Sequence, residues 1–235
     1  MVVFRRVLMI MAMLATVVVA GPPLAAEALY RYALHEPGQP PTLRPRSSSS
    51  PLAATAFWLD AGERLPLAVE PMSAWRAGWA IVLDRVAMSK QRKGERVASL
   101  AARAWLADRP RPAGMAKWHL TLWAATVWAS RHWDASAMTR VWMEGAWYGR
   151  GAHGLGAASL AYFDKQPNDL APHELALLVA LTRSPSSLSP DCQPERATGA
   201  RAHVLGQLLS AGAISRSDHD LAVAQGLGAI PRHCE

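Results

Sequence analysis

The chain of 235 residues is poor in cysteine, phenylalanine and tyrosine, with two, three and four of each. Two cysteines exclude a disulfide-rich scaffold and a four-cysteine zinc site. The eight histidines form no HExxH motif and no pairing with cysteine at zinc spacing, which argues against a metal site. Charged residues make up 18% of the chain and hydrophobic residues 51%, a balance that excludes wholesale disorder.

Signatures of several common enzyme and binding classes are also missing. There is no GxSxG motif, and the glycine-rich stretch 149–156 follows no strand pattern, so neither a nucleophile elbow nor a phosphate-binding loop is indicated. No nucleic-acid-binding module is present, and we expect no nucleic-acid partner. The net charge of +7, carried mostly by arginine, suits an anionic lipid or phosphate-bearing substrate, or else reflects genome composition alone.

The N-terminal segment predicts export. Arg5 and Arg6 precede an uncharged, mostly apolar run over residues 7–21, which we expect Pro22 and Pro23 to break. This is the pattern of a signal peptide, and residues 24–28 offer small-residue cleavage sites. With the apolar residues before the arginines, the run nearly reaches the ~20 residues of a spanning helix.

Residues 1–28 are therefore interpreted as either a cleaved signal peptide or a membrane anchor. The remainder of the chain is expected to be exported, and to be periplasmic or anchored at the cytoplasmic membrane. In an oxidising compartment Cys192 and Cys234 would form a disulfide or remain two unpaired thiols, and the sequence leaves both alternatives open.

The body of the chain has helical periodicity. Proline and serine dominate residues 36–51, so we assign residues 29–52 to a linker. From about Pro51 onward no stretch shows sustained period-two alternation, and the predicted fold class is all-α, mainly helical. The predicted helices cover residues 73–88, 94–107, 115–131, 135–147, 155–163, 172–182, 195–211 and 215–225.

Two further segments have distinctive composition. Residues 175–181 are apolar on every side but too short to span a membrane, which predicts a buried core helix. Residues 184–194 carry several prolines and serines and are expected to form a loop.

Residues 142–205 carry four motifs in series. They read WMEGAWYGRGAHGLGAASLAYFDK, LAPHELALLVAL, SPSSLSP, and PERA followed by RAHVL. This order and spacing resemble the C-terminal half of the peptidoglycan glycosyltransferases, glycosyltransferase family 51, found in penicillin-binding proteins and monofunctional transglycosylases. The resemblance extends more weakly over residues 93–103 and covers about residues 51–215 in all.

The resemblance implies a lysozyme-like, two-lobed glycosyltransferase domain over residues 53–215, followed by a C-terminal helix and tail over residues 216–235. It implies polymerisation of lipid II at the outer face of the cytoplasmic membrane. The implied partners are lipid II or glycan strands, the membrane, and cell-wall synthesis proteins. No cofactor is expected, apart from a divalent cation such as Mg²⁺ that the family resemblance would allow.

The catalytic motifs of the family are degenerate here. Leu59 and Leu122 stand where the family has its two glutamates, and the basic pair before the second glutamate is also missing. Attack of a sugar hydroxyl requires a general base, and a pyrophosphate leaving group requires positive charge. The resemblance therefore implies the scaffold of the family with weak or lost activity.

The remaining candidate acids are Asp60, Glu63 and Glu144. Asp60 is the retained partner of the first glutamate but could simply begin the following turn. Glu63 lies nearby, and Glu144 is either a novel cleft acid or a solvent-exposed helix-terminal residue. Arg103 and Arg201 are candidate phosphate contacts, or else structural ion pairs or solvated surface residues, and Gly94 is retained from a substrate-binding segment.

Three hypotheses follow. The first is an active transferase in which Asp60 or Glu63 acts as base. The second is a non-catalytic module that binds lipid II or glycan, or a scaffold in an envelope assembly. The third is a lytic enzyme of the same fold, for which Glu144 beside Trp142 and Trp147 would be the acid.

Overall fold

The computed structural model describes residues 11, 20–35, 50–75, 77, 92–107, 109–110 and 112–230. The described part consists of helices joined by turns, with a single isolated bridge between Trp147 and His153. The all-α, mainly helical fold class predicted from the sequence is confirmed. The α-helices are α2 (Pro51–Asp60), α4 (Glu95–Ala107), α5 (Met115–His132), α6 (Ala135–Gly145), α7 (Leu155–Phe163), α8 (Pro172–Leu181), α9 (Pro194–Ser210) and α10 (Arg216–Ala224), with the short 3₁₀ helix η2 (Pro167–Asp169) before α8.

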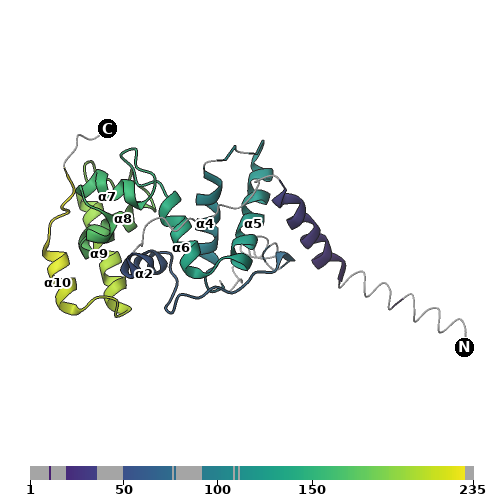
Figure 1. Ribbon diagram of the computed structural model, residues 1–235, viewed down its shortest axis with the longest axis horizontal. Helices are drawn as coiled ribbons and strands as arrows, with labels where there is room; N and C mark the ends of the chain where they lie inside the picture. The colour runs from purple at the N-terminus through teal and green to yellow at the C-terminus, as the bar shows by residue number, and fades with distance from the viewer. Residues whose placement is uncertain are drawn as a thin grey trace, which may run out of the picture.

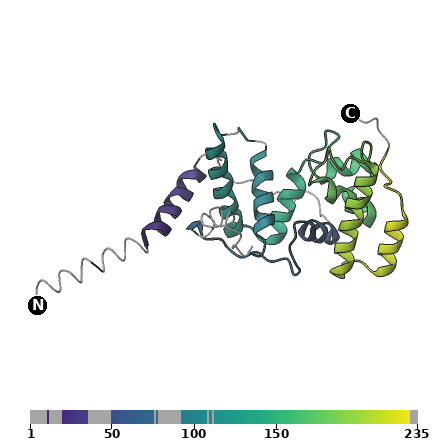
Figure 2. The same cartoon turned by 180° about the vertical axis from the view of Figure 1, so that it is seen from behind.

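The helices gather in two groups along an elongated body (Figure 1). One group holds α2 with α7, α8, α9 and α10, and the other holds α4 and α5 with a helical segment over residues 20–34. Helix α6 lies between the groups and packs against α4. The reverse view shows the same order, with the segment 20–34 at one end and α10 at the other (Figure 2).

The core of the first group is built on α8. Every residue from Glu174 to Leu181 is buried, as the apolar composition of this segment predicts. Pro172 occupies the first turn, where its missing N–H costs no hydrogen bond. Glu174 accepts a hydrogen bond from the backbone N–H of Ala171 at 2.8 Å and pairs with Lys165 Nζ at 2.7 Å, which caps the helix start.

Tryptophans join α4 and α5 in the second group. Trp105 on α4 meets Trp128 and Trp133 with ring centroids 5.3 and 5.8 Å apart, and the latter two rings lie 5.2 Å apart. The two contacts of Trp133 are edge-to-face, an arrangement that stabilises a core beyond the apolar area that it buries. Asp134 then caps α6 by accepting a hydrogen bond from Ala137 N at 2.7 Å, so the chain reverses directly from α5 into α6.

The glycine-rich turn covers residues 149–154, and α7 then begins at Leu155, where the sequence predicts a helix. Gly154 has a φ of +84°, and an added Cβ would lie 2.7 Å from the carbonyl oxygen of Glu144. Glycine is therefore required here, because both the left-handed backbone and the close approach of α6 exclude a side chain.

Two N-terminal expectations need correction. Pro22 and Pro23 lie within the helical segment 20–34 and do not break it, and this helix crosses the boundary at residue 28 between the predicted leader and linker. Packing against α5 accounts for the helix, since tertiary contacts override local propensity. Residues 1–10, 12–19 and 36–49, which hold most of the predicted leader and linker, lie outside the described residues, as does most of the predicted helix 73–88.

Candidate functional site

An open groove of about 710 Å³ lies between the end of α2, the turn that follows it, and one face of α9. Its walls combine apolar side chains with acidic, basic and amide groups. The lining residues are Leu59, Gly62, Glu63, Arg64, Leu65, His203, Gly206, Gln207, Ser210 and Ala211. Mixed surfaces of this kind, with a few convergent polar groups, are typical of small-ligand and saccharide sites.

The turn after α2 is held in place by its own hydrogen bonds. Gly62 adopts a φ of +83°, and its N–H donates to the carbonyl oxygen of Leu59 at 2.8 Å. The indole Nε1 of Trp58, which is fully buried, donates to the carbonyl oxygen of Arg64 at 3.0 Å. The turn therefore folds back on α2 and holds Glu63 and Arg64 at the edge of the groove.

Helix α9 presents a polar face to the groove. His203, Gln207 and Ser210 follow at i, i+4 and i+7 and so share one side of the helix. The opposite side is buried through Val204, Leu205 and Leu208.

Gln207 connects α9 to the other wall. Its Nε2 donates to the carbonyl oxygen of Leu59 at 3.3 Å, whereas its buried Oε1 has no hydrogen-bond partner among the described residues. A buried acceptor without a partner is uncommon, and a hydroxyl of a bound ligand would satisfy it.

Asp60 directly follows the groove residue Leu59 in the chain and is not itself part of the groove lining. Its side chain is 2% exposed, and its Oδ1 lies 3.5 Å from Arg183 Nη1. Burial raises the pKa of this carboxyl, and the nearby charges of Arg183, His203 and Arg96 oppose that shift. A buried carboxyl with a raised pKa is suited to hold or transfer a proton. Since His203 also lines the groove, Asp60 is electrostatically coupled to the groove wall.

The sequence-predicted site residues are only partly brought together. Leu59 and Glu63 line the groove, and Asp60 does not. Leu122 is buried in the core contributed by α5 and does not line the groove. Glu144 lies at the exposed C-terminal end of α6, outside the groove lining.

The three remaining candidates lie elsewhere. Arg103 is exposed on α4. Arg201 is buried on α9, and its Nη1 donates to the carbonyl oxygen of Gly226 at 2.6 Å, so it contacts the C-terminal segment and does not line the groove. Gly94 precedes α4 with a φ of +79°, and an added Cβ would lie 2.7 Å from Val69 Cγ2. The observed environments of Arg201 and Gly94 are those of packing residues.

Sequence reasoning missed His203, Gln207 and Arg183. The spacing of His203, Gln207 and Ser210, opposite the apolar residues Val204, Leu205 and Leu208, was the available signal for the first two. Arg183 carries no signal in the sequence, because its relation to Asp60 arises only when α8 packs beside α2.

Among the residues that the structure describes, no group of three or more His, Cys, Asp or Glu side chains could hold a metal ion. Likewise, none of the helices in the described part of the chain is both long and apolar enough to cross a membrane.

Part of this chain is similar to the transglycosylases. Residues 112–209 match the family described as Transglycosylase. Penicillin-binding protein 1A of Neisseria flavescens is 38% identical over 66 residues, and that of Vibrio cholerae serotype O1 is 38% identical over 65 residues. Each match covers 28% of this chain but 8% of the relative's length. The chain thus corresponds to a small part of these proteins.

A crystal structure of penicillin-binding protein 1A from Haemophilus influenzae is also similar, with a TM-score of 0.37 and 20% sequence identity over 57% of this chain and 17% of that chain. The matched range 112–209 includes α5 to α8 and nearly all of α9. His203 and Gln207 lie inside this range, whereas Asp60 and Glu63 lie outside it. The resemblance to the peptidoglycan glycosyltransferases of family 51 that the sequence motifs predict is therefore confirmed, and residues 112–209 form a transglycosylase-like domain.

Proposed function

We propose that this protein binds lipid II or nascent glycan strands in the groove between α2 and α9, on a transglycosylase scaffold with weak or lost polymerase activity. One observation supports the proposed loss of polymerase activity. Leu59 and Leu122, which stand at the two catalytic glutamate positions of the resembled family, are both buried side chains of the core. Neither can accept a proton from a sugar hydroxyl.

The composition of the groove supports saccharide binding. Ser210, Gln207 and His203 offer donors and acceptors along one wall, and Glu63 and Arg64 do so along the other. The exposed side chain of Leu65 supplies apolar surface for the non-polar faces of sugar rings. Arg64, His203 and the nearby Arg183 and Arg96 also favour a pyrophosphate-bearing ligand. The proposed partners are therefore lipid II or its polymer, at the outer face of the cytoplasmic membrane.

The disulfide state of Cys192 supports export. Cys192 is disulfide-bonded, and Cys234, the second cysteine of the chain, lies outside the described residues. Disulfides persist in oxidising compartments such as the bacterial periplasm. We therefore place the proposed function in the cell envelope.

Asp60 favours a second candidate function, polymerisation of lipid II. It is the acidic side chain whose pKa is raised by burial at the groove, and it directly follows the position of the missing glutamate. In this alternative Asp60 would take the proton of the attacking hydroxyl while Arg183 compensates its charge.

The test is incubation of the full-length protein in detergent with fluorescent lipid II. We expect saturable binding without polymer, and binding weakened about tenfold by Gln207→Ala, the magnitude of one lost hydrogen bond to a ligand. Arg196→Ala, on the exposed side of α9, is the matched control and should leave binding unchanged. Polymer that disappears in Asp60→Asn would establish the second candidate, and absence of both binding and polymer would refute both.

A further inference from the structure

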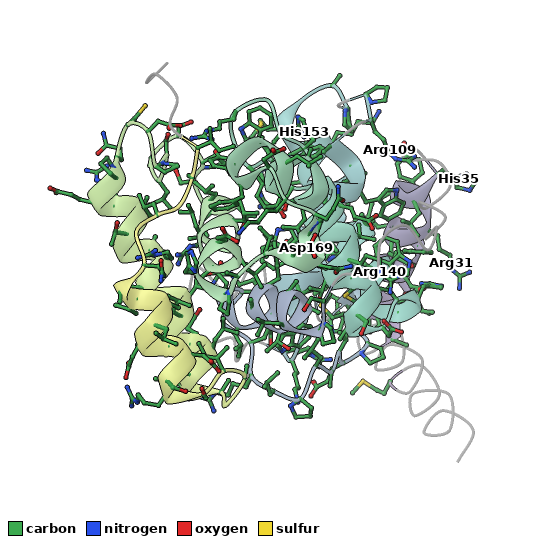
Figure 3. All side chains as sticks on the ribbon, turned by 60° about the vertical axis from the view of Figure 1, so that its left-hand side comes forward. Arg31, His35, Arg109, Arg140, His153 and Asp169 are labelled. Carbon is green, nitrogen blue, oxygen red and sulfur yellow. The ribbon has the colours of Figure 1, made fainter. Side chains whose placement is uncertain are left out.

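The chain after α10 forms a strap on the outside of the group that holds α7, α8 and α9. It turns back from α10 and runs past α9 without forming a helix (Figure 3). Ile230 N donates to the carbonyl oxygen of Tyr162 at 2.7 Å, and Arg150 Nη2 donates to the carbonyl oxygen of Ile230 at 2.8 Å. These hydrogen bonds to its backbone hold residues 225–230, called the strap below, on the body.

Arg201 reaches the strap from α9. Its Nη1 donates to the carbonyl oxygen of Gly226 at 2.6 Å, and the residue is 2% exposed. Its buried Nε has no hydrogen-bond partner among the described residues. None of the ion pairs between described residues includes Arg201. The guanidinium charge is therefore buried against a neutral carbonyl oxygen, and this burial lowers the pKa of the group.

The acidic group nearest along α8 is already used by other partners. Glu174 Oε1 lies 2.7 Å from Lys165 Nζ, and its Oε2 accepts from the backbone N–H of Ala171 at 2.8 Å. Burial lowers the pKa of the neighbouring His173, Glu174 opposes that shift, and the charges of Arg201 and Lys165 add to it. The surroundings of Arg201 are thus short of negative charge, which is costly for a buried cation.

The strap covers this cluster with very little side chain. Gly226 and Gly228 are both exposed glycines. A Cβ added to Gly228 would lie 3.7 Å from His173 Nε2, so the strap backbone passes close to the imidazole. A Cβ added to Gly226 would meet nothing within 4 Å. Because glycine changes its backbone conformation readily, a small movement of the strap would open Arg201 and His173 to solvent.

We propose that Arg201 and His173 form a binding site for a tetrahedral oxyanion of the phosphate type, and that the carbonyl oxygen of Gly226 occupies this site until the anion displaces it. The oxygens of such an anion can accept from Nε and Nη1 of the guanidinium together and supply the missing charge. The carbonyl oxygen of Gly226 accepts from Nη1 and carries no full charge.

The anion and the strap therefore exclude each other at Arg201, and binding of the anion releases the strap from α9. The site is separate from the groove between α2 and α9, whose lining does not include Arg201. The inference thus goes beyond glycan binding and does not depend on it.

Hydrogen exchange of the full-length protein in detergent tests the competition. Inorganic phosphate is compared with sodium chloride at the same ionic strength, which screens charges equally. We expect exchange over residues 226–230 to accelerate several-fold in phosphate, while α8 stays protected. Arg201→Met should abolish the acceleration, and Arg196→Met, on the exposed side of α9, should retain it. Unchanged or slower exchange of the strap, or acceleration that persists in Arg201→Met, would overturn the proposal.

A second variant keeps Arg201 and supplies the charge from the strap itself. Gly226→Asp has open space for its side chain and should place a carboxylate beside the guanidinium. Gly226→Asn has the same shape without the charge and is the matched control. We expect phosphate to raise the melting temperature of the unsubstituted protein and of Gly226→Asn by about 2–4 °C.

Gly226→Asp should be more heat-stable than Gly226→Asn without phosphate and should gain nothing from it, because its own carboxylate fills the site. An unsubstituted protein that gains no stability from phosphate would refute the site. An equal gain in all three proteins would mean that phosphate binds elsewhere, for example in the groove, which also overturns the proposal.

Discussion

Arg150 and Asp191 form a buried ion pair that ties the glycine-rich turn to the loop before α9. Arg150 Nη2 lies 2.7 Å from Asp191 Oδ1, and Nε donates to Oδ2 at 2.9 Å. The same guanidinium donates to the carbonyl oxygens of Ala161 and Ile230 and stacks on the Tyr162 ring, with 4.1 Å between the guanidinium carbon and the ring centre. Arg150 itself has a φ of +51°, a conformation that a non-glycine residue keeps only when its surroundings hold it.

Removal of one partner of this pair should destabilise the protein strongly. We expect Arg150→Met to lower the free energy of unfolding by about 3 kcal/mol, because Asp191 would remain buried and uncompensated. Arg196→Met, an exposed position on α9, is the control and should change stability by less than about 0.5 kcal/mol. Denaturant unfolding monitored by tryptophan fluorescence measures both, and equal midpoints would show that the pair contributes little.

Asp60 should make stability depend on pH in a definite direction. Burial raises the pKa of this carboxyl above its ordinary value of 3.8, so the folded state binds its proton more tightly than the unfolded state does. Stability therefore falls as pH rises from 3.8 through the folded-state pKa, since the unfolded chain loses the proton first. Asp60→Asn removes the destabilisation that comes from ionising this buried carboxyl. At pH 7 the variant should therefore unfold at a higher temperature than the unsubstituted protein.

The comparison at low pH completes this test. Below pH 3.8 the carboxyl is protonated in both states, so the difference in melting temperature between Asp60→Asn and the parent should shrink. Glu195→Gln, an exposed change on α9, controls for the general effect of lost negative charge. A parent protein that is the more stable of the two at pH 7 would mean that the cations around Asp60 outweigh its burial. A destabilising carboxylate beside a groove is in turn what a functional role would explain.

The groove can be closed without damage to the helix that forms it. Gly206 lies on the groove side of α9, and an added Cβ meets nothing within 4 Å. Gly206→Leu should project into the groove and abolish lipid II binding, while it raises stability by about 0.5–1 kcal/mol through helix propensity. Gly199→Leu, in open space on the same helix, should stabilise equally and leave binding intact. Binding that survives Gly206→Leu would move the ligand site away from this groove.

Local patterns predicted the helices from α4 to α10, because their periodicity, caps and breaks lie within short windows, but they predicted neither α2 nor the helical segment 20–34. The apolar run 175–181 became the buried α8, and the proline- and serine-rich segment before α9 remained a loop. The relations that make the site depend on long-range packing. Asp60 meets Arg183 and His203 only when three helices assemble, and no spacing in the sequence encodes that. The sequence left Arg201 as a phosphate contact, a structural ion pair or a solvated residue, and only the packing of the C-terminal segment gives it its partner, the carbonyl oxygen of Gly226.

A substitution at Gly94 can show whether this residue serves packing or ligand binding. A Cβ at this position would lie 2.7 Å from Val69 Cγ2 and 3.1 Å from Val69 Cα, and the φ of +79° already disfavours any side chain. We expect Gly94→Ala to lower the free energy of unfolding by about 2–3 kcal/mol, of which about 1 kcal/mol comes from the backbone conformation. Gly114→Ala isolates that smaller part, because Gly114 has a φ of +87° with open space around it. Chemical denaturation of the two variants gives the difference, which measures the clash with Val69. Gly94→Ala could instead prove as stable as Gly114→Ala and yet lose lipid II binding. That result would mean that Gly94 serves substrate binding, as the sequence motif predicts, and not packing.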